Sequence, residues 1–271
     1  MIKYPEIDPV AISIPLPEFL HSTLGESLNI YWYGIAYVVS AYLIYLRMVA
    51  TKHKFGISAS KEEVSDVVFT YGLFLGVIIG GRLGSVFFYD LHLQLQDPFY
   101  FLKIWEGGMS FHGALIGGTL SMFFYARKNN YKFLTITDWV APQLPIALFL
   151  GRIANFINAE LYGRETDVSW GMIFPTDPMN LVRHPSQIYE AVLEGIVLFI
   201  FLNYVIRSAE KVGRKSAYFL IGYGVARSIA EIFRTPDLVW GNDFLLFSFL
   251  TQGQLLSIPM ILLGVFILSR K

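Results

Sequence analysis

Seven long apolar stretches constrain this chain of 271 residues more than any other feature of its sequence. Each is close to the roughly 20 residues that an α-helix needs to cross the hydrocarbon core of a bilayer. They are continuously apolar, whereas the strands of a membrane β-barrel alternate between apolar and polar residues. The pattern predicts an all-α integral membrane protein with seven transmembrane helices, at residues 30–49, 67–89, 109–126, 136–157, 187–206, 216–233 and 253–268.

Composition agrees with this class and narrows the chemistry. Charged residues make up 15% of the chain, against about 25% in a typical soluble domain. The chain has no cysteine, so it has no disulfide, no thiolate metal site and no cysteine nucleophile of its own. Its five histidines show no metal-binding spacing, and its net charge is zero. We therefore expect no metal, no cofactor and no nucleic-acid partner.

The loop charges predict the orientation of the helices. Basic residues gather after the first, third and fifth stretches and at the C-terminus, and the other loops are acidic or mixed. By the positive-inside rule, the N-terminus lies outside and the C-terminus lies in the cytoplasm. We expect one transmembrane domain over residues 1–271, with residues 159–186 as a small extracytoplasmic loop or cap. The mixed loops carry Asp90, Asp97, Lys103, Glu106, Glu165, Asp167, Asp177, Arg183, Asp237 and Asp243.

Small residues recur every four positions in two of the stretches. Glycine occupies positions 72, 76, 80 and 84 of the second stretch and positions 113 and 117 of the third. Such faces allow two helix backbones to approach closely in lipid, so the pattern favours helix packing. The alternative interpretation is that the glycines leave room for an acyl chain.

The most unusual polar residues lie at the end of the fourth stretch, in the sequence GRIANFINAELYGR at residues 151–164. An arginine at the centre of a membrane helix costs about 2.5–3.5 kcal/mol on insertion scales, so it needs a partner. Arg152 lies about 16 residues along an outward helix, which is roughly 24 Å at 1.5 Å per residue. That depth corresponds to the headgroup level of the outer leaflet. Asn155 is three residues further on and shares its helix face.

Other stretches bring polar side chains to the same depth. Tyr223, Arg227, Glu231 and Arg234 form one stripe on the sixth, and Gln187, Glu190 and Glu194 line one face of the fifth. Ionisable groups inside a membrane are functional by default, and the arginine fork suits phosphate. The set predicts a site for an anionic phospholipid. The alternative is an internal lattice of ion pairs in which glutamates neutralise the arginines. The whole set is His112, Arg152, Asn155, Glu160, Glu190, Glu194, Tyr223, Arg227, Glu231 and Arg234.

His112 opens the third stretch directly after a glycine-containing segment and directly before Gly113. A neutral imidazole that a ligand can approach closely is a candidate general base. The alternative is a histidine with a structural or interfacial role, which is common at the end of a membrane helix.

The motifs of this chain resemble those of one known family. The sequence at residues 151–164 resembles the signature of the bacterial prolipoprotein diacylglyceryl transferases. Further matches follow in the same order along nearly the whole chain: YWYG at 31–34, GGRLG at 80–84, WEGGMSFHG at 105–113, RHPSQIYE at 183–190, EIFR at 231–234 and GQLLS at 253–257. The chain departs from the family at Ala114 and Ala159, where the family usually has glycine.

The resemblance implies a multi-pass enzyme of the bacterial cytoplasmic (inner) membrane, with its active site toward the extracytoplasmic side. Such an enzyme transfers the diacylglyceryl group of phosphatidylglycerol to the lipobox cysteine thiol of a prolipoprotein, as the first step of lipoprotein maturation. The products are a thioether and glycerol phosphate. The implied partners are phosphatidylglycerol, the prolipoprotein signal peptide with its lipobox cysteine, and membrane lipid.

Residue roles follow as hypotheses. We expect His112 to be the base, with Glu160 or a phosphate oxygen of the lipid as alternatives, and Arg152 with Arg227 to hold the phosphate. Glu231 is expected to hold Arg227, four residues away. Rival classes are an anion transporter or channel, which the gathering of arginines at one depth disfavours, and a scaffold that binds anionic lipid. The expected substrate-binding residues are Tyr33, Asn155, Glu160, Gly163, Tyr223, Glu231 and Arg234, with Tyr33 taken from the family motif alone.

Overall fold

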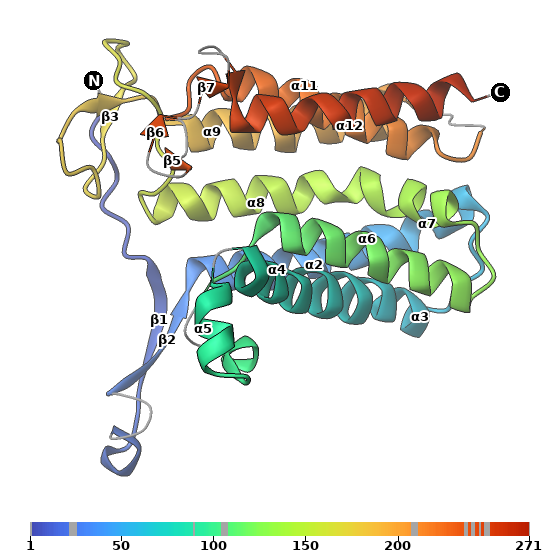
Figure 1. Cartoon of the computed structure of the whole chain (residues 1–271), viewed down its shortest axis with the longest axis horizontal. Helices are drawn as coiled ribbons and strands as arrows, with labels where there is room; N and C mark the ends of the chain where they lie inside the picture. The colour runs from blue at the N-terminus through green and yellow to red at the C-terminus, as the bar shows by residue number, and fades with distance from the viewer. Residues whose placement is uncertain are drawn as a thin grey trace. The chain divides into compact units, whose positions relative to one another are not determined.

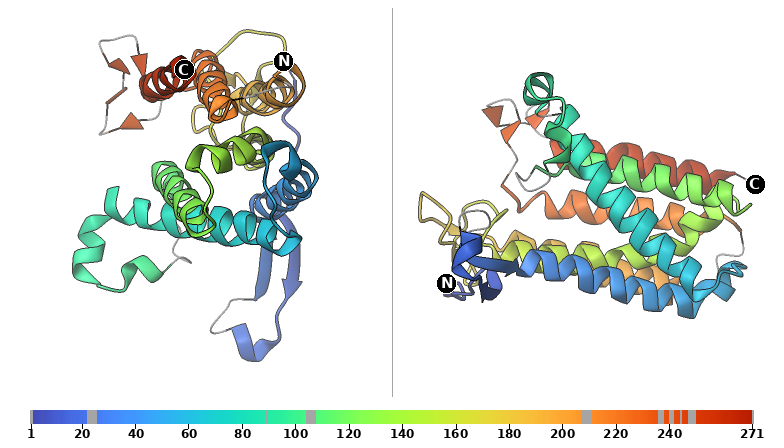
Figure 2. Two further views of the ribbon diagram at one scale, coloured as in Figure 1. Left: turned by 90° about the vertical axis from the view of Figure 1, so that its right-hand side faces the viewer. Right: turned by 90° about the horizontal axis from the view of Figure 1, so that it is seen from below.

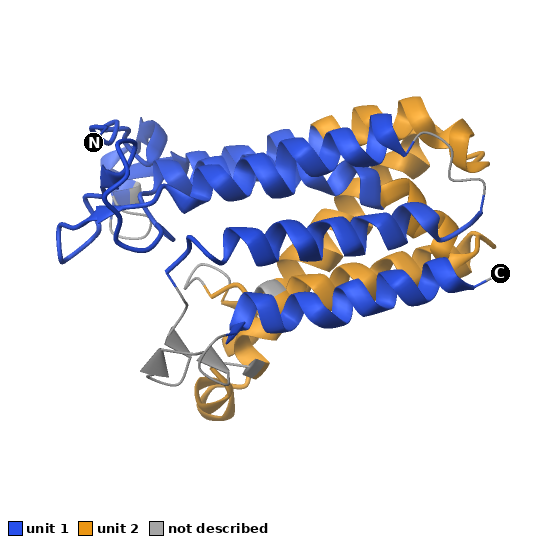
Figure 3. Cartoon of the chain, turned by 90° about the horizontal axis from the view of Figure 1, so that it is seen from above, with its two compact units in different colours: residues 1–42, 141–271 blue, residues 43–140 orange. Residues whose placement is uncertain are grey.

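The structure is a computed structural model of the chain, and it describes two compact units (Figure 3). The first unit contains residues 1–42 and 141–271, and the second contains residues 43–140. Some of the residues discussed above lie outside the described part: residues 105–107 of the glycine-containing motif, position 89, Asp237 and the side chain of Asp243. The structure describes all residues except 1, 22–25, 89, 104–107, 207–210, 236–237, 240–241, 244, 247–249 and 271.

Helical segments occupy each of the seven predicted stretches (Figure 1). Several of these helices change local winding along their length, so one stretch corresponds to more than one element. The first stretch forms α2 (Trp32–Thr51), and the second forms α3 (Lys61–Ser65), η3 (Asp66–Ile79) and α4 (Gly80–Phe88). The third forms α6 (Phe111–Lys128), and the fourth forms α7 (Phe133–Val140), η6 (Ala141–Gln143) and α8 (Leu144–Ile157). The fifth forms α9 (Ser186–Glu190), η7 (Ala191–Val197), α10 (Leu198–Ile200) and η8 (Phe201–Val205), the sixth α11 (Arg214–Ala230) and the seventh α12 (Gln252–Ser269).

Five of these helices, within the described residues, are long and apolar enough to cross a membrane. The two that fall short are α6 and α11. Helix α6 contains several glycines and ends in Arg127 and Lys128, which lower its mean hydropathy, and α11 has only 17 residues and begins with Arg214 and Lys215. The five helices are Trp32–Phe55, Lys61–Phe87, Phe133–Ile157, Ser186–Val205 and Gln252–Ser269. The chain is therefore a helical membrane protein.

The structure also contains short antiparallel hairpins, whereas the sequence predicted only helices. In the longest hairpin, β1 (Val10–Pro15) pairs with β2 (Ser27–Tyr31), and Ser13 lies opposite Asn29. The first apolar stretch was expected to be helical from residue 30, but Ile30 and Tyr31 belong to β2 because β1 pairs with them. The smaller pairs are β3 (Met172–Ile173) with β4 (Val182–Arg183), β5 (Leu238–Val239) with β6 (Asn242–Asp243), and β7 (Leu245–Leu246) with β8 (Leu250–Thr251).

In the first unit, the loop after α8 folds onto its own small aromatic core. Phe174 is fully buried, and its ring lies 5.2 Å from that of Tyr4 and 5.3 Å from that of Tyr162. The Tyr4 hydroxyl donates a hydrogen bond to the carbonyl of Phe156 at 2.6 Å, which ties the N-terminal segment to the last turn of α8. Residues 159–186 are thus packed against the helix that carries Arg152.

The same unit contains closely packed helix pairs. Helices α11 and α12 lie side by side (Figures 1 and 2). A Cβ placed on Gly224 of α11 would lie 2.7 Å from Cγ1 of Ile261 on α12. A Cβ on Gly195 of η7 would lie 2.6 Å from Cβ of Phe149 on α8. These contacts fix the faces of α8, α11 and the α9–η7 helix that carry the polar residues.

In the second unit, the glycines of η3 and α4 pack against those of α6. A Cβ on Gly80 would lie 2.7 Å from the carbonyl oxygen of Gly113 and 2.9 Å from Cα of Gly117. A Cβ on Gly76 would lie 2.9 Å from Cα of Gly118. The backbones touch at these positions, so the prediction of close helix packing is confirmed for this pair. This unit also contains η2 (Lys52–Phe55), α5 (Leu91–Gln96) and η4 (Tyr100–Leu102).

Candidate functional site

A single carboxylate oxygen lies at the centre of the polar residues of the first unit. Oε2 of Glu190, at the end of α9, is 2.8 Å from Nε of Arg152 on α8 and 2.9 Å from Nη1 of Arg227 on α11. It also lies 3.8 Å from Nη1 of Arg234. Glu190 itself has no exposed surface. Side chains from three segments far apart in the sequence therefore meet around Glu190.

Two further glutamates complete this arginine–glutamate cluster. Glu194, one turn beyond Glu190, is fully buried and lies 3.4 Å from Nη2 of Arg152 and 3.6 Å from Nη1 of Arg227. Glu231 contacts Nη2 of Arg227 at 2.5 Å, which confirms the predicted contact four residues apart on α11. Arginines 152, 227 and 234 thus face glutamates 190, 194 and 231, with no net charge.

Glu190 and Glu194 are four residues apart and share one helix face, and the winding of the helix changes between them. The π-helix η7 begins directly after Glu190 and contains Glu194. Such wider turns are rare and occur frequently at functional sites. The wider winding could not be predicted from the apolar pattern, which continues unchanged through residues 187–206.

Glu190 contacts Arg152 and Arg227 through Oε2, whereas Glu194 lies 3.4 Å from Arg152 through Oε2 and 3.6 Å from Arg227 through Oε1. The Oε1 atoms of Glu190 and Glu194 are buried and accept no hydrogen bond from any described residue, and the same is true of Oε1 of Gln187 and Oδ1 of Asn158. A buried acceptor without a donor costs about 1–3 kcal/mol, and functional sites are one place where such costs occur.

The two central arginines are not fully enclosed by protein. Relative exposure is 17% for the Arg152 side chain and 11% for that of Arg227, against 1% for Glu190. Each guanidinium has five N–H donors. Arg152 uses its three nitrogens on Glu190, Glu194 and Asn155, one contact each, so two of its five N–H groups are left for a ligand.

A chain of amide contacts leads from Arg152 to Glu160. Nη1 of Arg152 lies 3.5 Å from Oδ1 of Asn155, and Nδ2 of Asn155 donates to Oε1 of Glu160 at 2.8 Å. Nδ2 of Asn158 lies 3.4 Å from the same oxygen. Nε2 of Gln187 donates to the backbone carbonyl of Glu160 at 2.6 Å. Asn155 and Glu160 therefore lie together, as predicted, and they adjoin the arginine–glutamate cluster.

Gly163 has a clear packing role. Its N–H donates to the carbonyl of His184 at 2.8 Å, and its backbone pairs with that of Arg234. A Cβ here would lie 2.7 Å from Cβ of His184, so only glycine fits. The sequence did not reveal that Arg164, next to it, donates from Nε to the carbonyl of Arg234 at 3.0 Å. Gly163 thus helps to fix the backbone of Arg234.

Two expected tyrosines of the first unit pack against apolar and aromatic side chains. Tyr223 is buried against Leu198 and Leu202, and its ring stacks on Phe219 with centroids 5.9 Å apart. The ring of Tyr33, in the first turn of α2, packs against Tyr37 at 5.3 Å. The contacts of Tyr33 therefore add no support for a role in the site, and that role still rests on the family motif.

His112 belongs to the second unit, where it is the second residue of α6 and is partly buried. Ser110 caps this helix by accepting a hydrogen bond from the N–H of Gly113 at 3.3 Å. The N–H of Ser110 in turn donates to the carbonyl of Gly81 at 2.9 Å. The backbone on both sides of His112 is therefore fixed by contacts with α4.

The two departures from the family motifs have different structural settings. Ala114 lies within α6, where alanine is well accommodated. Ala159 has a φ of 53°, in the left-handed region that glycine adopts at little cost. Its methyl group packs in the cluster of Tyr4 and Phe174. Only the second departure places a side chain in an unfavourable backbone conformation.

One carboxylate of the 159–186 loop is strongly held. Asp177 accepts hydrogen bonds from Nε of Arg183 at 2.8 Å and from the N–H groups of Met179 and Leu181. The hydrogen bond from Arg183, followed by those from the two backbone N–H groups, lowers the pKa of Asp177 to about 2. No group of three histidine, aspartate or glutamate side chains in the described part of the chain is arranged to hold a metal ion.

Comparison with known proteins gives one consistent result. Residues 21–270 match the family model described as prolipoprotein diacylglyceryl transferase. The chain is 46% identical over 268 residues to the phosphatidylglycerol–prolipoprotein diacylglyceryl transferase of Ectopseudomonas mendocina, which covers 98% of this chain and 94% of the relative. It is 45% identical over 271 residues to the Acinetobacter baylyi protein of the same name, which covers 99% and 93%. The corresponding Pseudomonas entomophila protein is 44% identical over 270 residues, with 99% and 95% covered.

Proposed function

The chain belongs to the prolipoprotein diacylglyceryl transferase family, and on that premise we propose that its arginine–glutamate cluster binds the phosphate of the lipid substrate. Like its relatives, the chain is a transferase that moves the diacylglyceryl group of phosphatidylglycerol to a prolipoprotein, in lipoprotein biosynthesis. The acceptor in this proposal is the thiol of the lipobox cysteine, which the substrate supplies because the enzyme has no cysteine.

One observation carries the assignment of the phosphate site. Arg152 and Arg227, from two different helices, both lie within 3 Å of the same oxygen of Glu190. Two guanidiniums held around one point can each donate to a different oxygen of a phosphodiester. Because Glu190 is buried and the arginines retain exposed surface, the phosphate binds on the side of the guanidiniums opposite Glu190.

The arrangement supports a displacement at carbon. The thiolate attacks the glyceryl carbon next to the phosphate, a C–S bond forms, and the C–O bond breaks with its electron pair going to the phosphate oxygen. The products are a thioether and glycerol phosphate, on which one more negative charge develops. Fixed guanidiniums at this position stabilise the developing charge without reorganisation.

The thiol, with a free pKa of about 8.5, must lose its proton before it attacks. We assign this step to His112, whose imidazole can accept a proton near neutral pH. The support is its position in the first turn of α6, where the backbone is fixed on both sides. A His112→Gln enzyme with an unchanged rate and pH profile would exclude this role and favour Glu160 as the base.

Other residues orient the lipid or the arginines in this proposal. Asn155 and Glu160 extend from Arg152 by hydrogen bonds, so they reach the part of the headgroup beyond the phosphate. Glu231 and Arg234 hold Arg227 and Glu190 from the α11 side. Tyr33, Gly163 and Tyr223 complete the set, Gly163 through the backbone and Tyr223 through packing.

The membrane topology of the proposal has seven spans, with the N-terminus outside and the C-terminus in the cytoplasm. Helices α6 and α11 are added to the five spans described above, and the loop charges support the orientation. Residues 159–186 then form an extracytoplasmic cap, and the site faces the outer side of the bacterial inner membrane. Single cysteines placed at Lys128 and Trp170 test this in the naturally cysteine-free chain. An impermeant maleimide applied to intact cells is expected to label only the one at Trp170.

The experiment that tests the function uses purified protein, vesicles with phosphatidylglycerol labelled in its diacylglyceryl group, and a lipobox peptide. Label is expected to move to the peptide that contains cysteine and not to the matching serine peptide. Binding of the lipid without transfer would instead indicate a scaffold, and movement of anions across the vesicle membrane would indicate a transporter.

A further inference from the structure

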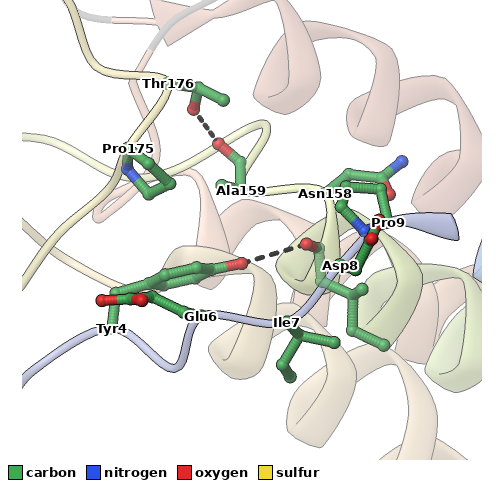
Figure 4. A pocket seen from close by; sticks show the side chains of 10 residues that line it. Tyr4, Glu6, Ile7, Asp8, Pro9, Asn158, Ala159, Pro175 and Thr176 are labelled. Carbon is green, nitrogen blue, oxygen red and sulfur yellow. Dashed lines mark hydrogen bonds between the residues drawn. The ribbon is translucent and has the colours of Figure 1, made fainter.

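A groove in the first unit runs between the N-terminal segment and the loop after α8. Its inner part is a cavity of about 430 Å³ lined by Tyr4, Ile7, Asn158 and Pro175, among others (Figure 4). A second cavity of about 400 Å³ shares Tyr4 and Pro175 with the first and continues to Ile173. The two cavities share Tyr4, Glu6 and Pro175 in their walls, so they adjoin each other along the N-terminal segment, and we treat them together as one groove. Its combined size is in the range of ligand-binding sites.

The inner end of this groove adjoins the proposed reaction site. Asn158 lines the groove and also lies 3.4 Å, through Nδ2, from Oε1 of Glu160. Glu160 is hydrogen-bonded to Asn155, which contacts Arg152. The groove therefore begins at the last turn of α8, a few hydrogen bonds from the proposed phosphate site, and leads away from it along the N-terminal segment.

The N-terminal segment that borders the groove contains unpaired backbone groups. The N-terminal segment before β1 contains no helix or strand over residues 2–8 (Figure 1). The N–H groups of Lys3, Tyr4, Glu6 and Asp8 make no hydrogen bond within the described part of the chain. Residues 2–8 are not a sheet edge, because the N–H of Ile7 turns back to the carbonyl of Pro5 at 2.9 Å, but their unpaired N–H groups can each donate to a carbonyl of a bound peptide. Binding of this kind depends little on the side chains of the ligand.

The residues that line the groove favour ligands with small apolar side chains and without acidic ones. Ile7 and Pro175 make the groove partly apolar, which suits small apolar side chains. Glu6 and Asp8 lie at its edge. Glu6 is paired with Lys3 at 2.8 Å, so Asp8 leaves a net negative charge there. A ligand with acidic side chains is therefore disfavoured.

We propose that this groove binds, in extended form, the part of the polypeptide substrate that directly follows the acceptor cysteine. The inference rests on the proposed function, which puts the acceptor thiol beside the arginine–glutamate cluster. The chain beyond that thiol must continue away from the membrane, and the groove leads from the end of α8 along the loop that the proposal places outside. Main-chain pairing explains how one enzyme accepts prolipoproteins whose sequences differ after the cysteine.

The test compares three lipobox peptides on the wild-type protein at saturating phosphatidylglycerol. One ends at the cysteine, one continues for four residues, and one carries the same four residues with N-methylated backbone amides. The extension is expected to lower the peptide KM about tenfold, the equivalent of one or two main-chain hydrogen bonds, and N-methylation is expected to remove that gain. An extension with two aspartates is expected to bind more weakly than the neutral one.

Two variants then locate the effect. Ile7→Trp and Ile173→Trp fill the inner and outer parts of the groove at half-exposed positions, so both are expected to fold. They are expected to raise the KM of the extended peptide to that of the short one and to leave the KM of phosphatidylglycerol unchanged. Met179→Trp, on an exposed residue of the same loop that does not line the groove, is the matched control and is expected to have no effect.

The outcomes separate the two levels of inference. Transfer with equal KM for all three peptides overturns the groove proposal and leaves the proposed function intact. A raised KM for phosphatidylglycerol in Ile7→Trp or Ile173→Trp also overturns it, because the groove then holds lipid. Absence of transfer to any peptide overturns both. The peptide comparison uses only wild-type protein, so it remains decisive if a tryptophan variant does not fold.

Discussion

Replacement of Glu190 by glutamine perturbs the centre of the arginine–glutamate cluster with little change in shape. The glutamine oxygen can take the place of Oε2, between Arg152 and Arg227, and its NH₂ group can take the place of Oε1, which has no donor in the described structure. Three arginines then face two glutamates. Breaking a buried ion pair by removing one partner costs about 3–5 kcal/mol. Because Glu194 and Glu231 remain, we expect the lower end, about 3 kcal/mol of unfolding free energy.

The same change should weaken the lipid site, because Glu190 is the contact that Arg152 and Arg227 share. We expect the KM of phosphatidylglycerol to rise about tenfold, or about 1.4 kcal/mol, and kcat to fall, with the peptide KM unchanged. The assays are denaturant unfolding and label transfer at varied lipid and peptide concentrations. Glu190→Asp should recover part of the lipid affinity, and the exposed Glu165→Gln is the matched control. A lower lipid KM with wild-type stability would refute the reasoning, because Glu190 would then compete with the phosphate rather than position the arginines.

Three further predictions test separate parts of the structure. Arg227→Lys keeps the charge but loses the planar fork, so kcat should fall about 100-fold or more in the transfer assay; near-full activity would exclude bidentate binding. Gly113→Leu should lower the yield of folded protein and its unfolding temperature, because a side chain would meet backbone of the facing helix, whereas Gly118→Leu points into open space and should be tolerated; equal effects would contradict the packing. The pKa of Asp177 is lowered from about 3.9 in the unfolded chain to about 2, so its contribution is complete above about pH 5 and is lost progressively as pH falls through about 2. The hydrogen-exchange protection factors of residues 159–186, taken relative to the intrinsic rate at each pH, should fall over that range in the wild type and change less in Asp177→Asn, and identical profiles would show that the contact with Arg183 is not responsible.

The length of the apolar stretches, the spacing of polar residues within them and the residue types were sufficient to predict the helices and much of the site. Apolar stretches of the right length located every long helix, and spacing placed Arg227 against Glu231 and Arg152 beside Asn155. Intramembrane charge indicated that the arginines needed partners. These are properties of one helix at a time, which a sequence displays directly.

Contacts between residues of different helices could not be predicted from the spacing of residues along one helix. The sharing of one Glu190 oxygen by Arg152 and Arg227 depends on how α8, α9 and α11 pack against one another. The pairing of β1 with β2 shortened the first predicted helix, because strand pairing is a long-range effect. The left-handed conformation of Ala159 was signalled only by the glycine usual in the family.

The central claim is that Arg152 and Arg227 together hold the phosphate of phosphatidylglycerol. Solid-state NMR dephasing between ³¹P of the lipid and ¹⁵N of arginine side chains measures this directly, in membranes that contain His112→Gln protein to slow turnover. We expect ³¹P contacts at hydrogen-bonding distance that weaken in Arg152→Lys and again in Arg227→Lys. Signals that are unchanged in both variants, or that disappear only when Arg164 is replaced, would contradict the account and leave the two arginines bound to glutamates alone.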